Sequence, residues 1–263
     1  MFPLKDNIPT RRFPFLTVAL IVANVVMYFG FQGAEIFGGP NEQPGTQGNV
    51  VEYGAIPYEI SHPGKGCELT NEQIVCEGQP GVVGEAPEQP PTWLTVLTSM
   101  FMHGGLLHIG GNMLFLWIFG NNIEDSMGRL KFIAFYLLGG VAALAAQTLV
   151  GPDATTPTIG ASGAVAAVLG AYAVLYPRAR VVTAVLIIFF FTLVELPALL
   201  VLGLWFLLQV FYGTAELAAP VGEGGGVAYF AHIGGFVFGL LLIKLFADRA
   251  NRDYLGGRRV PVY

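Results

Sequence analysis

The sequence predicts an all-α, polytopic membrane protein with six transmembrane helices and both termini on the cytoplasmic side. Three observations support this fold class. The chain is 54% hydrophobic and only 12% charged, with a mean hydropathy of +0.60, whereas soluble domains carry about a quarter charged residues. Long apolar runs recur along the chain, and basic residues are segregated from acidic ones. With that segregation, the formal net charge of -5 gives no indication of nucleic-acid binding.

Six segments are apolar enough to be membrane helices, because a helix needs about 20 apolar residues to cross roughly 30 Å of hydrocarbon. Four of these segments are long: 13–32, 132–150, 194–213 and 227–246. Two are shorter and rich in glycine: 104–120 and 160–176. The first segment follows basic residues, as a signal peptide would, but no small-x-small cleavage pattern follows it. We therefore expect it to be a retained anchor.

The basic residues predict the orientation, because Lys and Arg accumulate in cytoplasmic loops. With a cytoplasmic N-terminus, all but one of the 13 basic residues lie inside, and the exception is Lys65. Arg180 must then be inside, so that only one crossing fits between it and the next outer loop. Residues 181–193 are accordingly predicted to be an interfacial or re-entrant segment. Their β-branched and aromatic composition favours a strand.

The expected organisation follows from these spans. It consists of a cytoplasmic N-terminus (1–12), the first helix (13–32), a long acidic outer loop (33–92), a core of five further helices (93–247) and a basic cytoplasmic tail (248–263). The outer loop holds nine Glu and many Gly and Pro, which is typical of a loosely ordered cap. Its Cys67 and Cys76 are the only cysteines. A disulfide is preferred over two free thiols or a metal pair, because no His lies at ligand spacing beside them.

Few polar side chains lie at membrane depth, where each is a functional candidate because burying it is costly. Ser162, His232, His108 and Asn112 all lie near the outer ends of even-numbered spans, and hence at one level. His108 and Asn112 are four residues apart and share a helix face. His103 lies on another face, and no carboxylate is near. We therefore expect neither a metal site nor a cofactor.

Two faces of small residues are expected to bring a serine and a histidine together. One face consists of Ser162, Ala166 and Gly170, and the other consists of Ala231, Gly235 and Gly239, next to His232. Small faces allow two helices to approach closely, and a serine next to a histidine is a nucleophile with its general base. The alternatives are a serine that only caps its helix and a histidine that only bonds between helices. No acid is placed to orient His232, so the pattern predicts a dyad without a third member.

His108 and Asn112 complete this candidate site. Both side chains can donate hydrogen bonds to an oxyanion, as can the backbone N–H of Ser162 at a helix start. Four motifs contain these residues: His103-x4-His108-x3-Asn112, Leu116-Trp117-x2-Gly120-x3-Glu124, Gly160-Ala161-Ser162-Gly163, and Ala231-His232-x2-Gly235-x3-Gly239. In their order and spacing, residues 93–243 resemble the rhomboid family of intramembrane serine proteases.

The resemblance implies a six-helix bundle with a cavity open to the outer side. It implies Ser162 as nucleophile, His232 as base, and His108 and Asn112 at the oxyanion site. It also implies single-pass membrane proteins in the lipid bilayer as substrates. The expected location is the plasma membrane of a prokaryote, and the oligomeric state is left open. Competing functions are a non-catalytic binder of membrane clients, which would lack the serine or the histidine, and a channel or transporter, whose polar residues would reach both faces.

One departure from the family pattern concerns the support of His232. Members often carry an aromatic residue four positions after the serine, where it packs on the histidine, and this chain has Ala166 there. Phe236 or Tyr229 is expected to hold the imidazole instead. The glycine-rich segment 212–227 leads directly into His232, and we expect it to form a mobile lid because glycine imposes little backbone preference.

Overall fold

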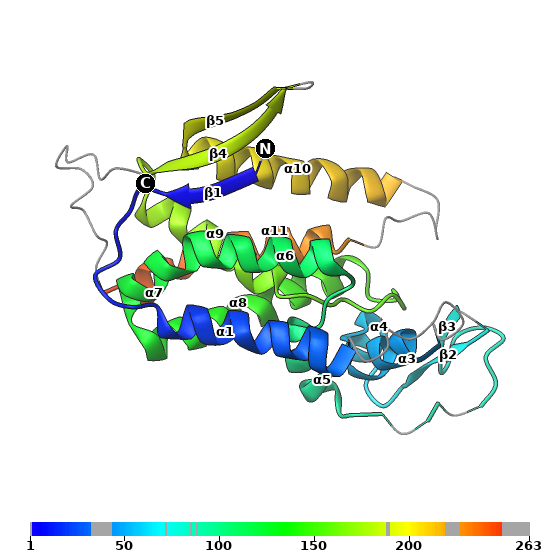
Figure 1. The fold of residues 1–263 in the computed structure, drawn as a ribbon. Helices are drawn as coiled ribbons and strands as arrows, with labels where there is room; N and C mark the ends of the chain where they lie inside the picture. The colour runs from blue at the N-terminus through cyan, green and yellow to red at the C-terminus, as the bar shows by residue number, and fades with distance from the viewer. Residues whose placement is uncertain are drawn as a thin grey trace.

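Helix α9 (Ser162–Leu175) forms the centre of a helical bundle (Figure 1). The structure is a computed structural model that describes residues 2–32, 44–71, 73–84, 86–87, 89–187, 190–218 and 227–248. Every α9 residue from Gly163 to Ala173 is buried. Most of these residues are Ala, Gly or Val, so neighbouring helices approach its backbone closely. Most of the glycines of the expected lid, and almost all of the basic tail, lie outside the described residues.

Among the described residues, four helical segments are long and apolar enough to cross a membrane, and they overlap the four long predicted runs. They are Phe15–Gln32, which joins α1 (Phe15–Val26) to a π-helical turn (Met27–Gln32), and the helices α8 (Arg129–Val150), α10 (Ala198–Ala218) and α11 (Tyr229–Phe246). The protein is therefore a mostly helical, multi-pass membrane protein.

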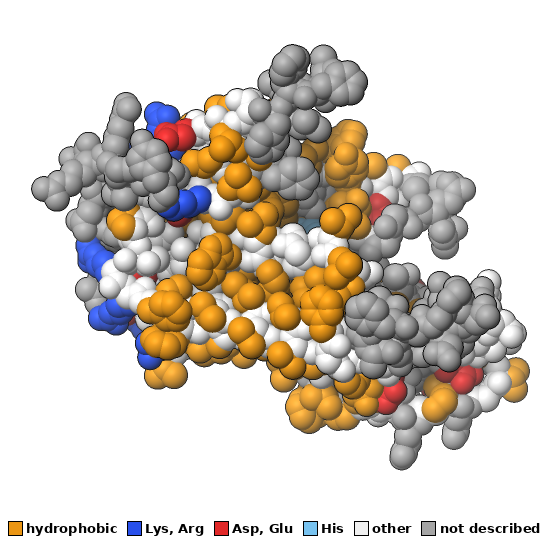
Figure 2. All heavy atoms as spheres, in the orientation of Figure 1, with side chains coloured by type: hydrophobic (Ala, Val, Ile, Leu, Met, Phe, Trp, Pro, Cys, Tyr) orange, Lys and Arg blue, Asp and Glu red, His pale blue; other side chains and the backbone are white. Residues whose placement is uncertain are grey.

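The two shorter predicted runs are also helical. The first contains α6 (Leu106–Phe115) and a π-helical turn (Leu116–Gly120), and α7 (Asn121–Met127) follows them without a break. The second is α9. The count of six spans and the orientation of the termini stay predictions. Figure 2 shows the Lys and Arg side chains gathered at the end of the bundle where α1 and α8 begin.

A three-stranded antiparallel sheet corrects the all-α prediction. It consists of β1 (Phe2–Asp6), β4 (Arg180–Ile187) and β5 (Phe190–Pro197), in the order β1-β4-β5. The sheet lies beside α10, which begins directly after Pro197 (Figure 1). The strand-like interpretation of 181–193 is confirmed, because this β-branched stretch pairs as a hairpin. The N-terminal segment, expected only as a cytoplasmic tail, supplies the third strand.

A buried carboxyl group joins the sheet to the bundle. Asp6 is 6% exposed, and its Oδ2 accepts hydrogen bonds from Asn122 Nδ2 at 2.7 Å and from the Tyr172 hydroxyl at 2.5 Å. These contacts fasten β1 to α7 and to the C-terminal half of α9. Burial raises the pKa of Asp6 from 3.8 to about 7, because a charged carboxylate loses its hydration there.

This pKa predicts a pH-dependent stability. Between pH 4 and 7 the folded state holds a proton on Asp6 that the unfolded chain has released, so this group lowers the free energy of unfolding as pH rises, and above pH 7 its contribution is constant. We expect the unfolding temperature to fall between pH 5 and 7.5 more steeply in the wild type than in Asp6→Asn. Thermal unfolding in detergent measures both. Parallel pH curves for the two proteins would contradict the assignment.

The described part of the segment 33–92 is a folded cap, in contrast to the loosely ordered outer loop expected. It contains α3 (Pro44–Tyr53), α4 (Pro57–Ser61) and a hairpin of β2 (Cys67–Thr70) and β3 (Gln73–Cys76). The predicted disulfide between Cys67 and Cys76 is confirmed. The cap has its own small core, and Glu59 Oε1 accepts a hydrogen bond from Cys67 N–H at 2.9 Å. These contacts order a segment of polar composition. Helix α5 (Thr92–Thr98) and a 3-10 turn (Ser99–Phe101) lead on to the bundle.

Candidate active site

Ser162 and His232 meet inside the bundle. The Nε2 atom of His232 lies 2.8 Å from Ser162 Oγ, although the two residues are 70 positions apart in the sequence. Ser162 is in the first turn of α9 and His232 in the first turn of α11. Both line a cavity of about 720 Å³, and His108 and Asn112 line it too. The structure thus brings all four predicted site residues together.

Backbone contact between α9 and α11 holds this pair in place. A Cβ atom at Gly235 would overlap the carbonyl oxygen of Gly163, and one at Gly239 would overlap that of Ala167. A Cβ atom at Gly170 would likewise overlap the carbonyl oxygen of Phe236. The two small-residue faces therefore pack against each other as the sequence predicted. Only glycine allows this approach, since any side chain would push backbone against backbone.

Helix α8 fixes the start of α11 from the other side. Gln147 Oε1 accepts a hydrogen bond from Ala231 N–H at 3.1 Å. This N–H is in the first turn of α11, where backbone donors have no acceptor within the helix. Because Ala231 directly precedes His232, the contact fixes the backbone from which the imidazole extends.

Two side-chain donors line the same cavity as the serine. The side chain of Asn112 is 7% exposed, and its Nδ2 has no hydrogen-bond partner among the residues that the structure describes. Gly104 N–H donates to His108 Nδ1 at 3.3 Å, so His108 carries its ring proton on Nε2. A Cβ atom at Gly160 would lie 2.8 Å from His108 Nε2 and 3.5 Å from Ser162 Oγ. The protonated edge of His108 and the serine hydroxyl therefore border the same turn.

Gly160 itself permits this turn. Its φ of +123° is in the region that favours glycine, and a side chain there would collide with the His108 ring. Ser162 begins α9 directly after it, so the Ser162 N–H is one of the helix-start donors that lack an intrahelical acceptor. Ser162, His108 and Asn112 thus each provide a donor, and all three residues line one cavity.

The support of the imidazole differs from the sequence-based expectation. Neither Phe236 nor Tyr229 holds it: Phe236 stacks on Phe206, and Tyr229 on Tyr212. Instead His232 Nδ1 lies 2.8 Å from Gln209 Oε1, and the His232 ring lies beside the indole of Trp205, with centroids 5.8 Å apart. Both supports come from α10. The sequence search for an acidic partner missed Gln209, although it is the only amide in the apolar α10 run and so met the criterion of a polar group at membrane depth.

A second serine–histidine contact lies in the cap and offers no comparable site. Ser61 Oγ is 2.9 Å from His62 Nδ1, and His62 Nε2 is 3.6 Å from Asp153. The Ser61 hydroxyl, however, donates its proton to the Pro152 carbonyl oxygen at 2.5 Å, and the Asp153 side chain is 80% exposed. Neither residue of the Ser61–His62 pair lines the cavity that holds Ser162.

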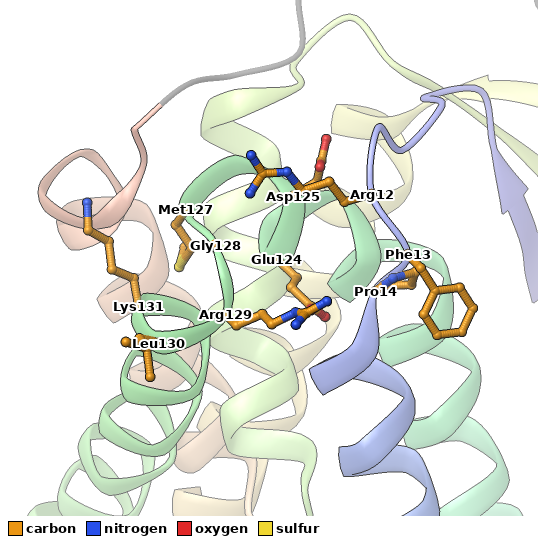
Figure 3. A pocket seen from close by; sticks show the side chains of 10 residues that line it. All are labelled: Arg12, Phe13, Pro14, Glu124, Asp125, Met127, Gly128, Arg129, Leu130 and Lys131. Atoms are coloured by element: carbon orange, nitrogen blue, oxygen red, sulfur yellow. The ribbon is translucent and has the colours of Figure 1, made fainter.

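Another cavity, of about 610 Å³, lies between the starts of α1 and α8, where Arg12, Asp125 and Arg129 border it (Figure 3). Its lining contains no Ser, Cys or His. Glu124 there accepts hydrogen bonds from Leu16 N–H at 3.1 Å and from Thr17 N–H at 2.8 Å. This carboxylate therefore caps the start of α1, and its negative charge interacts favourably with the positive end of the helix dipole. Its role is structural.

The fold and this site define a multi-pass helical membrane protein with a serine–histidine pair inside its bundle. Residues 90–249, more than half of the chain, match the family model described as Rhomboid domain. The chain therefore belongs to the rhomboid family, whose members are typically intramembrane proteases. This assignment confirms the resemblance seen in the sequence motifs.

Curated relatives agree with the family assignment. The chain is 31% identical over 159 residues to Rhomboid protein 1, mitochondrial, of Saccharomyces cerevisiae, covering 56% of this chain and 40% of that protein. It is 38% identical over 100 residues to the human Presenilin-associated rhomboid-like protein, mitochondrial, covering 37% and 26%. It is 35% identical over 79 residues to the Rhomboid protease GluP of Bacillus subtilis, covering 30% and 15%. The chain thus spans less than half the length of these relatives.

These relatives bear on the expected location. Two of the three are mitochondrial by name, so they do not support the expected plasma membrane of a prokaryote. A membrane-embedded, multi-pass protein is what the fold and the family establish. Among the described residues no three His, Cys, Asp or Glu side chains are grouped as metal ligands would be.

Proposed function

We propose that this chain is an intramembrane serine endopeptidase that hydrolyses peptide bonds in or near the transmembrane segments of membrane proteins. One observation carries the proposal: His232 Nε2 lies 2.8 Å from Ser162 Oγ in a cavity that Asn112, with its unpartnered donor, also lines. The proposal includes six spans, cytoplasmic termini and a site that opens to the outer side.

The reaction follows from the roles of these groups. As Ser162 Oγ attacks the carbonyl carbon of the substrate, its proton passes to His232 Nε2. The negative charge that develops on the carbonyl oxygen is stabilised by three donors: the Ser162 N–H, the Asn112 amide and the protonated Nε2 of His108. His232 then gives the proton to the leaving amine. Water, activated by the same imidazole, cleaves the acyl-enzyme and restores the serine.

The proposed partners are single-pass membrane proteins within the lipid bilayer. A non-catalytic client binder has no need for a serine hydroxyl held against an imidazole, which argues against that competing function. A channel or transporter is disfavoured because the four polar site residues line one cavity, rather than a path to both faces. Nucleic acid and cofactors have no role in this proposal.

A fluorophosphonate probe tests the nucleophile. In the full-length protein reconstituted in lipid, the probe should modify Ser162, because its hydroxyl has a base, His232, within hydrogen-bond distance inside a cavity. Mass spectrometry locates the adduct, and EDTA should leave cleavage of a membrane-helix substrate unchanged. An adduct on another residue, or a loss of cleavage in EDTA that zinc restores, would contradict the proposal.

A further inference from the structure

We propose that Gln209 is a positioning residue, which holds His232 through Nδ1 in the tautomer whose unprotonated Nε2 faces Ser162. The inference rests on the proposed function and adds a member to the predicted dyad. Its basis is a continuous chain of contacts: Gln209 Oε1 to His232 Nδ1 at 2.8 Å, and His232 Nε2 to Ser162 Oγ at 2.8 Å. The three side chains come from three different helices.

The hydrogen bond of the Gln209 amide nitrogen determines the orientation of the amide group. Gln209 Nε2 donates a hydrogen bond to the Trp205 carbonyl oxygen at 3.3 Å, so the amide nitrogen is engaged and the amide oxygen faces the imidazole. A carbonyl oxygen only accepts hydrogen bonds. His232 Nδ1 must therefore carry the ring proton. A neutral imidazole has one such proton, which leaves the Nε2 lone pair to accept the hydrogen of the serine hydroxyl.

This support replaces the one that the chain lacks on the serine helix. Ala166 has only a methyl group where an aromatic ring was expected, and the His232 ring is held from α10 instead, by the Gln209 amide and the Trp205 indole. Gln209 is 9% exposed, and at this depth a neutral amide avoids the cost of burying a carboxylate. Because the acceptor is on α10, His232 is oriented as a base only while α10 is seated against α11.

A purely structural role for Gln209, as a hydrogen bond between α10 and α11, makes a different prediction. Loss of such a bond would lower the stability of the protein. It would not selectively change the turnover number or its pH dependence. Loss of a positioning residue would lower kcat with little change in KM, since the ring would sample the other tautomer and other rotamers.

Two substitutions separate these roles in the full-length protein reconstituted in lipid. Gln209→Met keeps the length and apolar bulk but has no carbonyl acceptor, and Gln209→Glu keeps an acceptor and adds charge. We expect Gln209→Met to lower kcat about 10- to 100-fold, the loss seen when a metal-binding histidine loses its orienting partner, with KM nearly unchanged. Gln209→Glu should recover much of this loss and shift the acidic limb of the kcat/KM profile to higher pH, because a carboxylate stabilises the imidazolium.

Thr214→Val is the matched control, because Thr214 is a polar residue of the same helix whose hydroxyl donates to its own helix backbone, at Val210 and Phe211. It should leave kcat and the pH profile unchanged. Wild-type kcat and pH profile in Gln209→Met, with Ser162→Ala inactive, would overturn the inference and leave the proposed function intact. So would equal losses in both Gln209 variants that track a lower unfolding temperature. Full activity of Ser162→Ala would instead remove the proposed function, and the inference with it.

Discussion

Ser162→Ala is expected to abolish cleavage of a membrane-helix substrate, and His232→Ala is expected to reduce it to near background. The first variant lacks the attacking oxygen, and the second lacks the base that lies within hydrogen-bond distance of it. Neither should unfold the protein, because alanine suits a helix and the α9–α11 contact is made by glycines. Cleavage of a reporter in proteoliposomes and thermal unfolding in detergent measure the two properties separately.

Two further variants serve as comparisons for the effects of Ser162→Ala and His232→Ala. Ser61→Ala removes the hydroxyl of the cap's serine–histidine contact and should leave cleavage unchanged. Asn112→Ala removes one proposed oxyanion donor and should lower kcat by about 10²- to 10³-fold, the usual effect of losing such a donor. Wild-type activity in either Ser162→Ala or His232→Ala would refute the dyad.

The contacts of the site were predictable where local patterns decide them. The i, i+4 spacing of His108 and Asn112 determines their common helix face, and small-residue repeats determine how α9 and α11 pack. These two rules bring Ser162 to His232 without knowledge of any other contact. The long apolar runs likewise predict α1, α8, α10 and α11, because hydrocarbon thickness sets their length.

The remaining features depend on contacts between distant residues. β1 pairs with β4 across almost 180 positions, and its composition alone does not distinguish it from a tail. The cap is ordered by a disulfide and by side-chain contacts such as that of Glu59, not by periodicity. Gln209 was missed for a chemical reason. A carboxylate is the usual partner of a catalytic histidine, but a buried amide oxygen accepts the same proton.

Gly239→Ala is expected to lower cleavage by about 100-fold or more and to lower the unfolding temperature. The added methyl group would overlap the Ala167 carbonyl oxygen, and because both partners are backbone, no side-chain rotation relieves the overlap. Helix α11 must therefore move away from α9, and the movement is transmitted to His232, about two turns along the same helix. A misplacement of about 1 Å at reacting groups costs about 10²-fold in rate, and overpacking costs about 1–3 kcal/mol of stability.

Gly203→Ala provides the matched control for this prediction, because a Cβ atom at Gly203 in α10 meets nothing within 4 Å. It makes the same chemical change in another membrane helix and should preserve both cleavage and unfolding temperature. Adding the methyl group at Gly235 instead, against the Gly163 carbonyl oxygen, should reproduce the Gly239→Ala defect close to the serine. If Gly239→Ala retains wild-type cleavage and thermal stability, the close contact of α9 and α11 is not what holds Ser162 against His232.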